Sequence, residues 1–584
     1  MRYRNLTSAI ALAALATLPA AVLANDGHGP MAGHDAAHSS GHSSDHAPGH
    51  SPDQVAAQIN GADRARLEAN VRFLADDSLE GRETGTTGYE LAAGYVAGQL
   101  AAMGVAPGGE NGTYFQTVPL IVGKSTGAQG SVLELGGKDL PTGLTFGDDF
   151  VTYGKVGSGA GEVEGDLVFV SYGFAADGYE RDDFAGVDLN GKIAVVLRGS
   201  HSDMNSEEQA HFRSTMNERL SERGAIATIM LFTPKSSAQF PFSAVKRFVS
   251  GSTSMDWRTA DGKVFSSSPN IMASAIVSPE LSEKLFAGQP VTWDQLVEFE
   301  SGESDTIQSF DMGISAKIAW DNTSELSESR NVLGFIPGTD PALKDEIVIV
   351  TAHLDHTGKD DDHGTAAEDG AEGEVKDGIN NGAMDNATGT ASMLEVARLL
   401  AAKPARRPVL VVALTAEEKG LVGSDYMARN PLPMGGKPVA NINLDMPIVT
   451  YELMDVVAFG AERTTMIGPI TQAVEKAGMK LSPDPIPEQG LFTRSDQYSF
   501  VQQGVPSLFL VTGHANGGRE AQSEFLGKHY HKPSDEVGLV DFQQLKRFAD
   551  VNHDITRSVA DMEQRPVWLK GDFFGRAFGG EMQE

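Results

Sequence analysis

The sequence contains no cysteine among its 584 residues. Such a chain forms no disulfide, and it has no thiolate to act as a nucleophile or to bind a metal ion. Any metal ion would have to be held by His, Asp and Glu side chains. The length predicts two or more domains, because a single hydrophobic core stops growing at about 250–300 residues.

Basic residues are few relative to acidic ones. The chain has 46 Lys and Arg against 79 Asp and Glu, which gives a formal net charge of −33. This charge disfavours nucleic acid and anionic membrane surfaces as partners, because both are negative themselves. The same charge favours solubility and suits the binding of cations.

A long, mainly apolar run occurs only at the N-terminus, in MRYRNLTSAIALAALATLPAAVLA. Two arginines open this segment, and Val22 and Ala24 fit a small-residue cleavage site before Asn25. A membrane anchor is the alternative, but polar residues and Pro19 interrupt the apolar run. We therefore predict that residues 1–24 are a secretory signal peptide and that the protein is periplasmic or secreted, in a Gram-negative bacterium.

Residues 25–52 are rich in Gly, Ser, Ala and Asp, and they hold six of the 15 histidines. This composition builds no core and predicts a disordered leader. The histidines either recruit zinc loosely or belong to an inert, solvated segment, and the composition leaves both readings open. The leader is not the active site, because a flexible tail does not preorganise ligands.

The hydrophobic pattern of the rest of the chain changes twice. Residues 131–305 contain short β-like runs such as KIAVVLRG and AIATIMLF, which predicts an inserted, mostly-β domain. From about residue 330, continuous apolar runs such as EIVIVTAH alternate with helical patterns. This alternation predicts an α/β domain with a mostly parallel, mixed sheet flanked by helices. We assign residues 53–130 and 306–565 to that domain and residues 566–584 to a C-terminal tail.

Candidate ligands follow the ends of the predicted strands, where sites form in open α/β sheets. They lie in TAHLDH, NGAMDNATG, LTAEEKG, NINLDM and HYHKPSDE, and they are His353, Asp355, Asp385, Glu417, Glu418, Asp445, His529 and His531. Each one alone is more often a helix cap or a solvated side chain. It is improbable that the residues at all five strand or loop ends are only helix caps or solvated side chains.

Two His and three carboxylates would hold two zinc ions about 3.5–4 Å apart with a hydroxide between them. A further carboxylate can then accept the proton of the water. The pair Glu417–Glu418 offers one base and one ligand, because successive side chains point in different directions. Oxygen-rich ligand sets also accept manganese or cobalt.

These motifs occur in one order within residues 330–536, together with RSDQYSF, and they resemble the co-catalytic zinc peptidase family of bacterial leucyl-type aminopeptidases and glutamate carboxypeptidase. GRETGTTG at residues 81–88 resembles the N-terminal segment of that family. The inserted region, with FVSYGFAADGYERDDFAGVDLNGKIAVVLRG, resembles a protease-associated domain. The resemblance implies two Zn²⁺ ions per chain and peptide substrates.

The resemblance also implies a role for each residue. His353 and Asp445 would bind one zinc, Glu418 and His531 the other, and Asp385 would bridge them through a cis Asp385–Asn386 peptide. Asp355 would hydrogen-bond and orient His353, and Glu417 would be the general base and then the acid for the leaving amine. Tyr530 and Arg494 would contact the substrate or its developing oxyanion. We expect His356 and His529 to be bystanders, because each zinc already has its ligands.

An exported aminopeptidase is therefore the predicted function. A carboxypeptidase or dipeptidase on the same scaffold is the first alternative, and it would need a cluster of arginines facing the pocket. A glutaminyl cyclase is disfavoured because it works with a single zinc. A non-catalytic zinc-binding protein is disfavoured because no ligand or base is missing. We expect the acidic stretch KDDDHGTAAEDGAEGEVKDGIN to be a surface insertion rather than a calcium site or specificity loop, because it lacks an EF-hand pattern.

Overall fold

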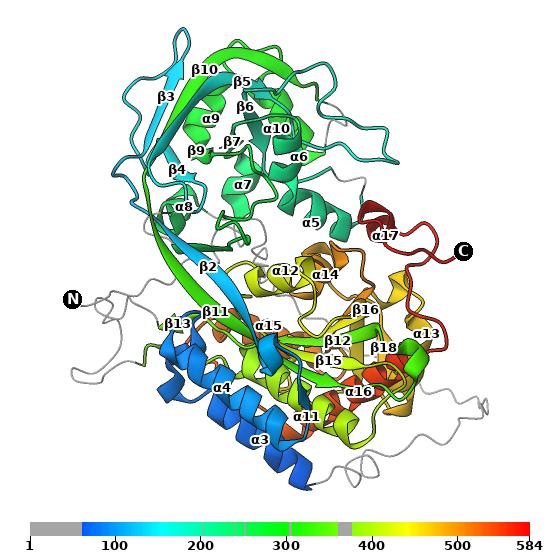
Figure 1. The fold of residues 1–584 in the computed structure, drawn as a ribbon. Coiled ribbons are helices and arrows are strands. Elements are labelled where there is room, and N and C mark those ends of the chain that lie inside the picture. Colours follow the sequence, from blue (N-terminus) through cyan, green and yellow to red (C-terminus); the bar gives the residue numbers. More distant parts are fainter. Residues whose placement is uncertain (1–60, 202–203, 240, 250–252, 303–306, 360–376) are drawn as a thin grey trace, which may run out of the picture.

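The computed structural model describes residues 61–584 except 202–203, 240, 250–252, 303–306 and 360–376. The predicted signal peptide, the His-rich leader and most of the acidic insertion lie outside these residues. The described chain forms two lobes, each built on its own sheet (Figure 1).

The main sheet has ten strands and is mixed, as predicted. Its order is β18 (Lys480–Ser482), β17 (Asp455–Phe459), β19 (Ser507–Thr512), β16 (Lys437–Asn443), β12 (Glu346–His353), β15 (Val409–Leu414), β11 (Asn322–Ile336), β2 (Phe115–Ser125) and β8 (Thr253–Trp257), and β1 (Ala106–Pro107) pairs with β11. The four central strands β19, β16, β12 and β15 are parallel, whereas β11, β2 and β8 pair antiparallel.

Helices cover both faces of this sheet, which explains the continuous apolar runs. In β12, Val348 and Val350 pack into one hydrophobic core, and Ile347 and Ile349 pack into another on the opposite face. The first core contains residues of α3 (Gly61–Leu74), α4 (Thr87–Ala102), α11 (Thr388–Ala402), α13 (Ile467–Lys476), α15 (Gly518–Lys528) and α16 (Phe542–Ala560). The second contains residues of α12 (Val422–Arg429) and α14 (Gln497–Val501).

Several short elements connect these layers. They are the two-stranded pair β13 (Gly358–Lys359) and β14 (Ile379–Asn380), and the single turns η1 (Asp77–Arg82), η2 (Glu110–Gly112), η3 (Pro341–Leu343), η4 (Ala383–Ala387), η5 (Ala461–Arg463), η6 (Pro487–Gln489), η7 (Leu491–Thr493) and η8 (Val537–Leu539). Of these turns, η1, η4 and η7 lie next to candidate site residues.

The second lobe, called the insert below, contains a sheet of seven strands. Its order is β3 (Val132–Gly136), β10 (Phe310–Trp320), β5 (Gly161–Phe169), β6 (Ile193–Leu197), β7 (Ala227–Leu231), β9 (Ala273–Val277) and β4 (Phe150–Gly154). The insert also carries α5 (Ser206–Ser214), α6 (Met216–Glu222), α7 (Pro234–Gln239), α8 (Phe242–Val249), α9 (Pro279–Leu285) and α10 (Trp293–Ser301). Four neighbouring strands, β5, β6, β7 and β9, are parallel. The insert is thus more helical than the predicted mostly-β domain, and whether it is a protease-associated domain stays a prediction.

Two long strands connect the lobes. β2 pairs antiparallel with β11 from Phe115↔Val332 to Ser125↔Asn322, and β10 continues into β11 after a single residue. β8 lies within the insert's stretch of sequence but pairs with β2 at the edge of the main sheet. Figure 1 shows these strands running from one lobe to the other.

The C-terminal segment is packed rather than free, in contrast to the predicted tail. Trp568 is fully buried, and α17 (Phe573–Ala577) buries Phe573 and Phe574. These side chains share one core with Phe174 and Phe212 of the insert and with Val457, Phe459, Phe492, Tyr498, Val501 and Phe509 of the main lobe. The C-terminus therefore fastens the insert to the main lobe.

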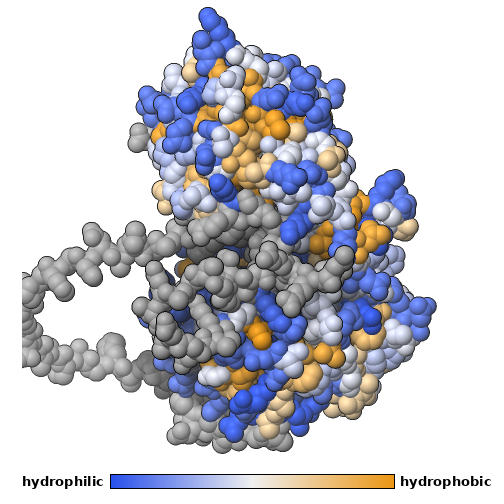
Figure 2. Space-filling model, turned by 90° about the vertical axis from the view of Figure 1, so that its left-hand side faces the viewer, coloured by the Kyte–Doolittle hydropathy of each residue, from blue (hydrophilic) through white to orange (hydrophobic). Residues whose placement is uncertain are grey.

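Hydrophilic residues surround smaller apolar areas on the face of the molecule shown in Figure 2. Within the described residues, we find no helix with the length and apolar character that crossing a bilayer requires.

Candidate metal centre

Three parallel strands deliver candidate residues to one edge of the main sheet. β12 ends at His353, the turn after β15 carries Glu417 and Glu418, and Asp445 follows β16. Parallel strands end on the same side of a sheet, so these side chains meet there. The sequence predicted this part of the site from strand ends alone.

Asp385 and His531 come from outside the strands. Asp385 lies in η4 before α11, and its backbone N–H donates to the carboxylate of Asp535 at 3.1 Å. The Asn386 amide oxygen accepts from the backbone N–H of Gly389 at 3.0 Å and of Met446 at 3.1 Å. The Asp385–Asn386 peptide is cis, as the resemblance implied.

The first group of ligands consists of His353, Asp385 and Asp445. His353 Nε2 lies 3.0 Å from Asp445 Oδ1 and 3.2 Å from Asp385 Oδ1. His353 Nδ1 donates to the backbone oxygen of Asp355 at 3.1 Å. A carbonyl only accepts, so this bond places the proton on Nδ1 and leaves Nε2 free to bind a metal ion.

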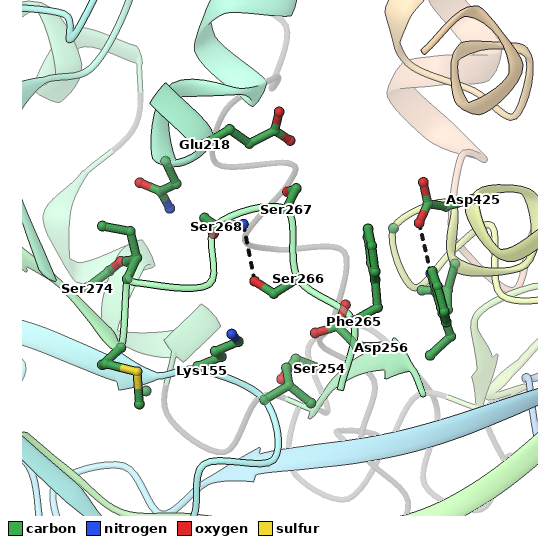
Figure 3. Close-up of a pocket in the computed structure, with 18 of the residues that line it drawn as sticks. Lys155, Glu218, Ser254, Asp256, Phe265, Ser266, Ser267, Ser268, Ser274 and Asp425 are labelled. Atoms are coloured by element: carbon green, nitrogen blue, oxygen red, sulfur yellow. Dashed lines mark hydrogen bonds between the residues drawn. The ribbon is translucent and has the colours of Figure 1, made fainter. Parts of the chain in front are cut away.

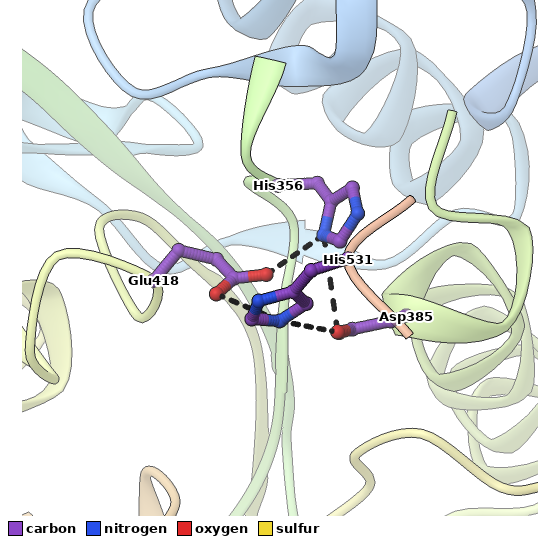
Figure 4. Close-up of side chains that lie close together, drawn as sticks. All are labelled: His356, Asp385, Glu418 and His531. Atoms are coloured by element: carbon purple, nitrogen blue, oxygen red, sulfur yellow. Dashed lines mark hydrogen bonds and ion pairs between the residues drawn. The ribbon is translucent and has the colours of Figure 1, made fainter. Parts of the chain in front are cut away.

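The second group consists of His356, Asp385, Glu418 and His531 (Figure 4). His531 Nε2 lies 3.1 Å from Asp385 Oδ2 and 3.4 Å from Glu418 Oε2. Asp385 therefore faces one group with Oδ1 and the other with Oδ2, which is the arrangement that a bridging carboxylate requires.

The prediction that His356 is a bystander is wrong, because its side chain lies within the second ligand group. Its Nδ1 lies 2.7 Å from Glu418 Oε1 and 3.9 Å from Asp385 Oδ2, and its buried Nε2 has no hydrogen-bond partner within the described structure. β12 ends at His353, so the alternation of side chains along a strand no longer applies three residues later. The only signal in the sequence was adjacency to a motif. His529 lies outside both groups, with its ring hydrogen-bonded to Ser534.

The electrostatics of the cluster favour a bound cation. Burial lowers the pKa of His531, but Glu418 and Asp385 outweigh it and raise the pKa to about 9. Burial raises the pKa of Asp385, yet hydrogen bonds from His353 and His531 hold it well below its usual range. Carboxylates and imidazoles are ligands that zinc accepts, so the donor set fits this metal.

Asp355 acts differently from the prediction. Only its backbone oxygen contacts the His353 ring, whereas its buried carboxylate accepts from the backbone N–H of Glu417 at 3.1 Å and of Glu418 at 3.3 Å. The Thr84 hydroxyl donates to the same carboxylate at 3.1 Å. Asp355 thus also holds the turn that presents the two glutamates.

Arg82 supports the site, and the sequence analysis missed its role. This fully buried guanidinium donates to the backbone oxygens of Leu354 at 2.9 Å, Asn381 at 2.7 Å and Gly382 at 3.1 Å. It therefore ties the end of β12 to the segment before Asp385. The signal available was its place within GRETGTTG.

Tyr530 and Arg494 both feel the charge of Glu417. The Tyr530 ring centroid is 3.8 Å from that of His531. Burial lowers the pKa of Arg494, while Tyr530 and Glu417 partly offset this effect. Burial also raises the pKa of Glu417 itself well above its usual range.

Comparison with known proteins identifies the main lobe. Residues 331–556 match the model of peptidase family M28. Over 257 residues the chain is 25% identical to the aminopeptidase YwaD of Bacillus subtilis, an alignment that covers 43% of this chain and 49% of YwaD. The match thus spans about half the length of that relative.

Solved structures of aminopeptidases also resemble the chain. An aminopeptidase from Aneurinibacillus sp. strain AM-1 is 18% identical, with a TM-score of 0.46, and 86% of this chain and 94% of that chain are covered. A zinc aminopeptidase from Bacillus subtilis is 17% identical, with a TM-score of 0.41, and 86% and 96% are covered. The likeness of the main lobe to peptidase family M28 rests on the match of residues 331–556 to the family model.

A separate cavity of about 360 Å³ lies between the lobes (Figure 3). Tyr153, Glu218 and Asp256 of the insert's stretch and Gly420 and Asp425 of the main lobe are among its lining residues. None of the predicted site residues lines it. Burial raises the pKa of Asp256 to about 7, Lys155 opposes the shift and Asp425 adds to it.

Proposed function

We propose that this chain is an exported, zinc-dependent aminopeptidase that binds two zinc ions. The observation that carries the proposal is Asp385, whose two carboxylate oxygens each face one of two adjacent ligand groups. His353 and Asp445 would hold one ion, Glu418 and His531 the other, and His356 is available to the second group. Zinc bound there would polarise the scissile carbonyl and make the attacking water more acidic.

Glu417 is the base in this proposal. It neighbours Glu418 but belongs to neither ligand group, and burial raises its pKa well above the usual range of a carboxyl group, which favours its taking up a proton. It would take the proton of the attacking water and then return it to the leaving amine. Asp355 keeps the Glu417 backbone in place, so the carboxylate meets the substrate in a fixed position.

The experiment that tests this function is hydrolysis of an aminoacyl-p-nitroanilide panel by the purified protein. We expect cleavage that is lost with a zinc chelator and falls about 10²- to 10⁴-fold in Glu417→Gln, because general-base catalysis contributes that much. Failure to cleave any free-amine substrate, together with cleavage of N-acetylated peptides, would replace the aminopeptidase with a carboxypeptidase.

Metal content tests the count and the identity of the ions. We expect two zinc ions per chain after residues 25–52 are deleted, because the proposed ligands all lie in the main lobe. Metal that disappears with the leader would instead favour a zinc-storing tail. Manganese or cobalt in the purified protein would change the metal assignment without changing the ligands.

Export rests on the N-terminal sequence. The proposed cleavage before Asn25 predicts a mature protein that begins with NDGHGP and that is recovered from the periplasm or the medium. Edman sequencing of the fractionated protein would test this, and an intact Met1 in the cytoplasmic fraction would contradict it.

A further inference from the structure

The cavity between the lobes holds two charged side chains that the metal centre does not use. Lys155 directly follows β4, and Asp256 belongs to β8. Figure 3 shows both side chains pointing into the same part of the cavity. Burial lowers the pKa of Lys155, and the nearby charge of Asp256 partly offsets this effect. In the described part of the chain, neither the Lys155 amine nor the Asp256 carboxylate forms a hydrogen bond or an ion pair, so the two charges face a shared space without contacting each other.

The lining also offers uncharged polar groups and apolar surface. The side-chain oxygen of Asn217, in α6, is buried and lacks a hydrogen-bond partner among the described residues. Ser266 and Ser274 add hydroxyl groups. Phe265 lines the cavity and stacks on Trp257, with ring centroids 4.3 Å apart. A volume of about 360 Å³ lies near the lower end of the range for ligand sites, about 300–1,000 Å³, which favours a small ligand over a long peptide.

Asp256 makes this cavity costly for the folded protein. Burial raises its pKa to about 7, so near neutral pH a largely buried carboxylate ionises with no hydrogen-bond donor among the described residues. A buried charge without a partner destabilises a fold, and such groups in clefts are typical of binding sites. A cationic group of a ligand would supply the missing partner, and the Lys155 amine is placed to bind an anionic group of the same ligand.

We propose that this cavity binds a free α-amino acid. The ammonium group would contact Asp256, the carboxylate would contact Lys155, and Phe265 would pack against the side chain. An α-amino acid carries its two charged groups on one carbon atom, which suits two opposite charges that lie close together without touching. Because an aminopeptidase releases amino acids, the inference rests on the proposed function for its choice of ligand, but the cavity and its charges do not depend on catalysis.

The cavity also borders the turn that carries the proposed base. Gly420 lines the cavity, and its backbone N–H donates to the backbone oxygen of Glu417 at 2.9 Å. Val422, another lining residue, donates in the same way to Ala416 at 3.0 Å. An amino acid in the cavity would contact this turn, so we expect it to change kcat without competing with the substrate.

Thermal-shift screening of the standard amino acids against the full mature chain tests this binding. We expect at least one of them to raise Tm, because a ligand that binds only the folded state stabilises it. Calorimetry then compares that amino acid with its amide, which lacks the carboxylate, and with its desamino acid, which lacks the ammonium group. Each loss should weaken binding about 10- to 100-fold, which is the range for hydrogen bonds to charged groups.

Variants locate the binding site. Asp256→Asn and Lys155→Met should each weaken binding of the amino acid about 10- to 100-fold, whereas Asp148→Asn, an exposed carboxylate of the insert, should not. Tm values of the same samples show that the variants are folded. His531→Ala, which alters the metal centre, should bind the amino acid as tightly as the wild type. Binding that is lost in His531→Ala but kept in Asp256→Asn would place the amino acid at the metal centre and overturn the cavity site.

Kinetics separate this proposal from the proposed function. In an active enzyme, the amino acid should change kcat in the wild type, and the effect should disappear in Asp256→Asn. Purely competitive inhibition that persists in Asp256→Asn would overturn the cavity site while leaving the peptidase intact. If the protein cleaves no peptide, the proposed function fails, and the binding measurements, which need no turnover, still decide on the cavity. No rise in Tm with any amino acid, or equally tight binding of the amide and the desamino acid, overturns the proposal.

Discussion

Asp355 illustrates how single side chains set up the site. Its backbone oxygen orients His353, while its carboxylate fixes the turn that carries Glu417 and Glu418. One residue therefore aligns a ligand of the first group with the base and a ligand of the second. Side chains that orient ligands in this way typically contribute 10- to 100-fold to activity or metal affinity.

Replacing Asp355 with Asn tests this role. The amide keeps the shape but turns one acceptor toward the Glu417 and Glu418 N–H groups into a donor. We expect kcat/KM to fall about 10- to 100-fold while two metal ions remain bound. Metal analysis and kinetics on the same sample check this. Loss of both ions at unchanged folding would instead mean that the Asp355 carboxylate is needed to hold the metal ligands as well as the base.

Asp256 in the cavity between the lobes predicts a pH dependence of stability. Its folded pKa of about 7 lies above the ordinary value, so ionisation costs the folded state more than the unfolded one. This cost is absent at pH values below the ordinary pKa and grows as pH rises to about 7. Asp256→Asn removes it and should raise Tm by about 1–3 °C at pH 8, with less effect at pH 5.

Thermal unfolding at both pH values measures this difference. Asp148→Asn, an exposed carboxylate of the same lobe, is the matched control and should show no such trend. A gain in Tm of the same size at pH 5 and pH 8 would contradict the assignment to Asp256.

At the scale of helices and strands, sequence patterns predicted the strands of the main sheet better than the helices of the insert or the loops around the site. EIVIVTAH forms β12, as predicted. A short, continuous apolar run is typical of a strand that is covered on both faces. The helices of the insert were missed because they are short: α5 buries only Glu207, Ala210, His211 and Phe212. The position of His356 could not be predicted, because the loop after β12 has no periodic pattern of side chains.

The packing of the C-terminal segment was not predicted, although Trp568, Phe573, Phe574 and Phe578 make it rich in aromatic residues. Trp568 is fully buried, and its indole N–H donates to the backbone oxygen of Gly504 at 2.8 Å. Trp568→Ala should cost about 3–5 kcal/mol of local stability. Limited proteolysis should then release residues 566–584 early, in contrast to Leu91→Ala, which alters an exposed side chain of α4. An unchanged digestion pattern would contradict this docking role.

For the molecule as a whole, metal binding and folding are linked. His353, Asp385, Glu418, Asp445 and His531 bring buried or half-buried charges together, and a bound cation relieves the repulsion among the carboxylates. Zinc at 100 times its Kd would add about 2.7 kcal/mol to the free energy of unfolding.

We therefore expect Tm to fall when zinc is removed by a chelator and to recover when zinc is added back. The difference should shrink in His531→Ala, which lacks one ligand, but not in His529→Ala next to it, whose ring lies outside both ligand groups. Differential scanning fluorimetry measures all three proteins. A chelator-independent Tm in the wild type would show that the cluster is stable without a metal ion.

The ladder between β2 and β11 gives this architecture a modular character. Ser125 and Asn322 lie directly opposite each other in register, so a two-residue turn such as Asn-Gly would be enough to join them. A chain shortened in this way keeps every residue of the two ligand groups, but it loses β8 from the edge of the main sheet and the insert's share of the core around Trp568. The residues of the metal centre are thus encoded outside the stretch between Ser125 and Asn322, whereas the edge of the main sheet and the packing of the C-terminal segment depend on that stretch.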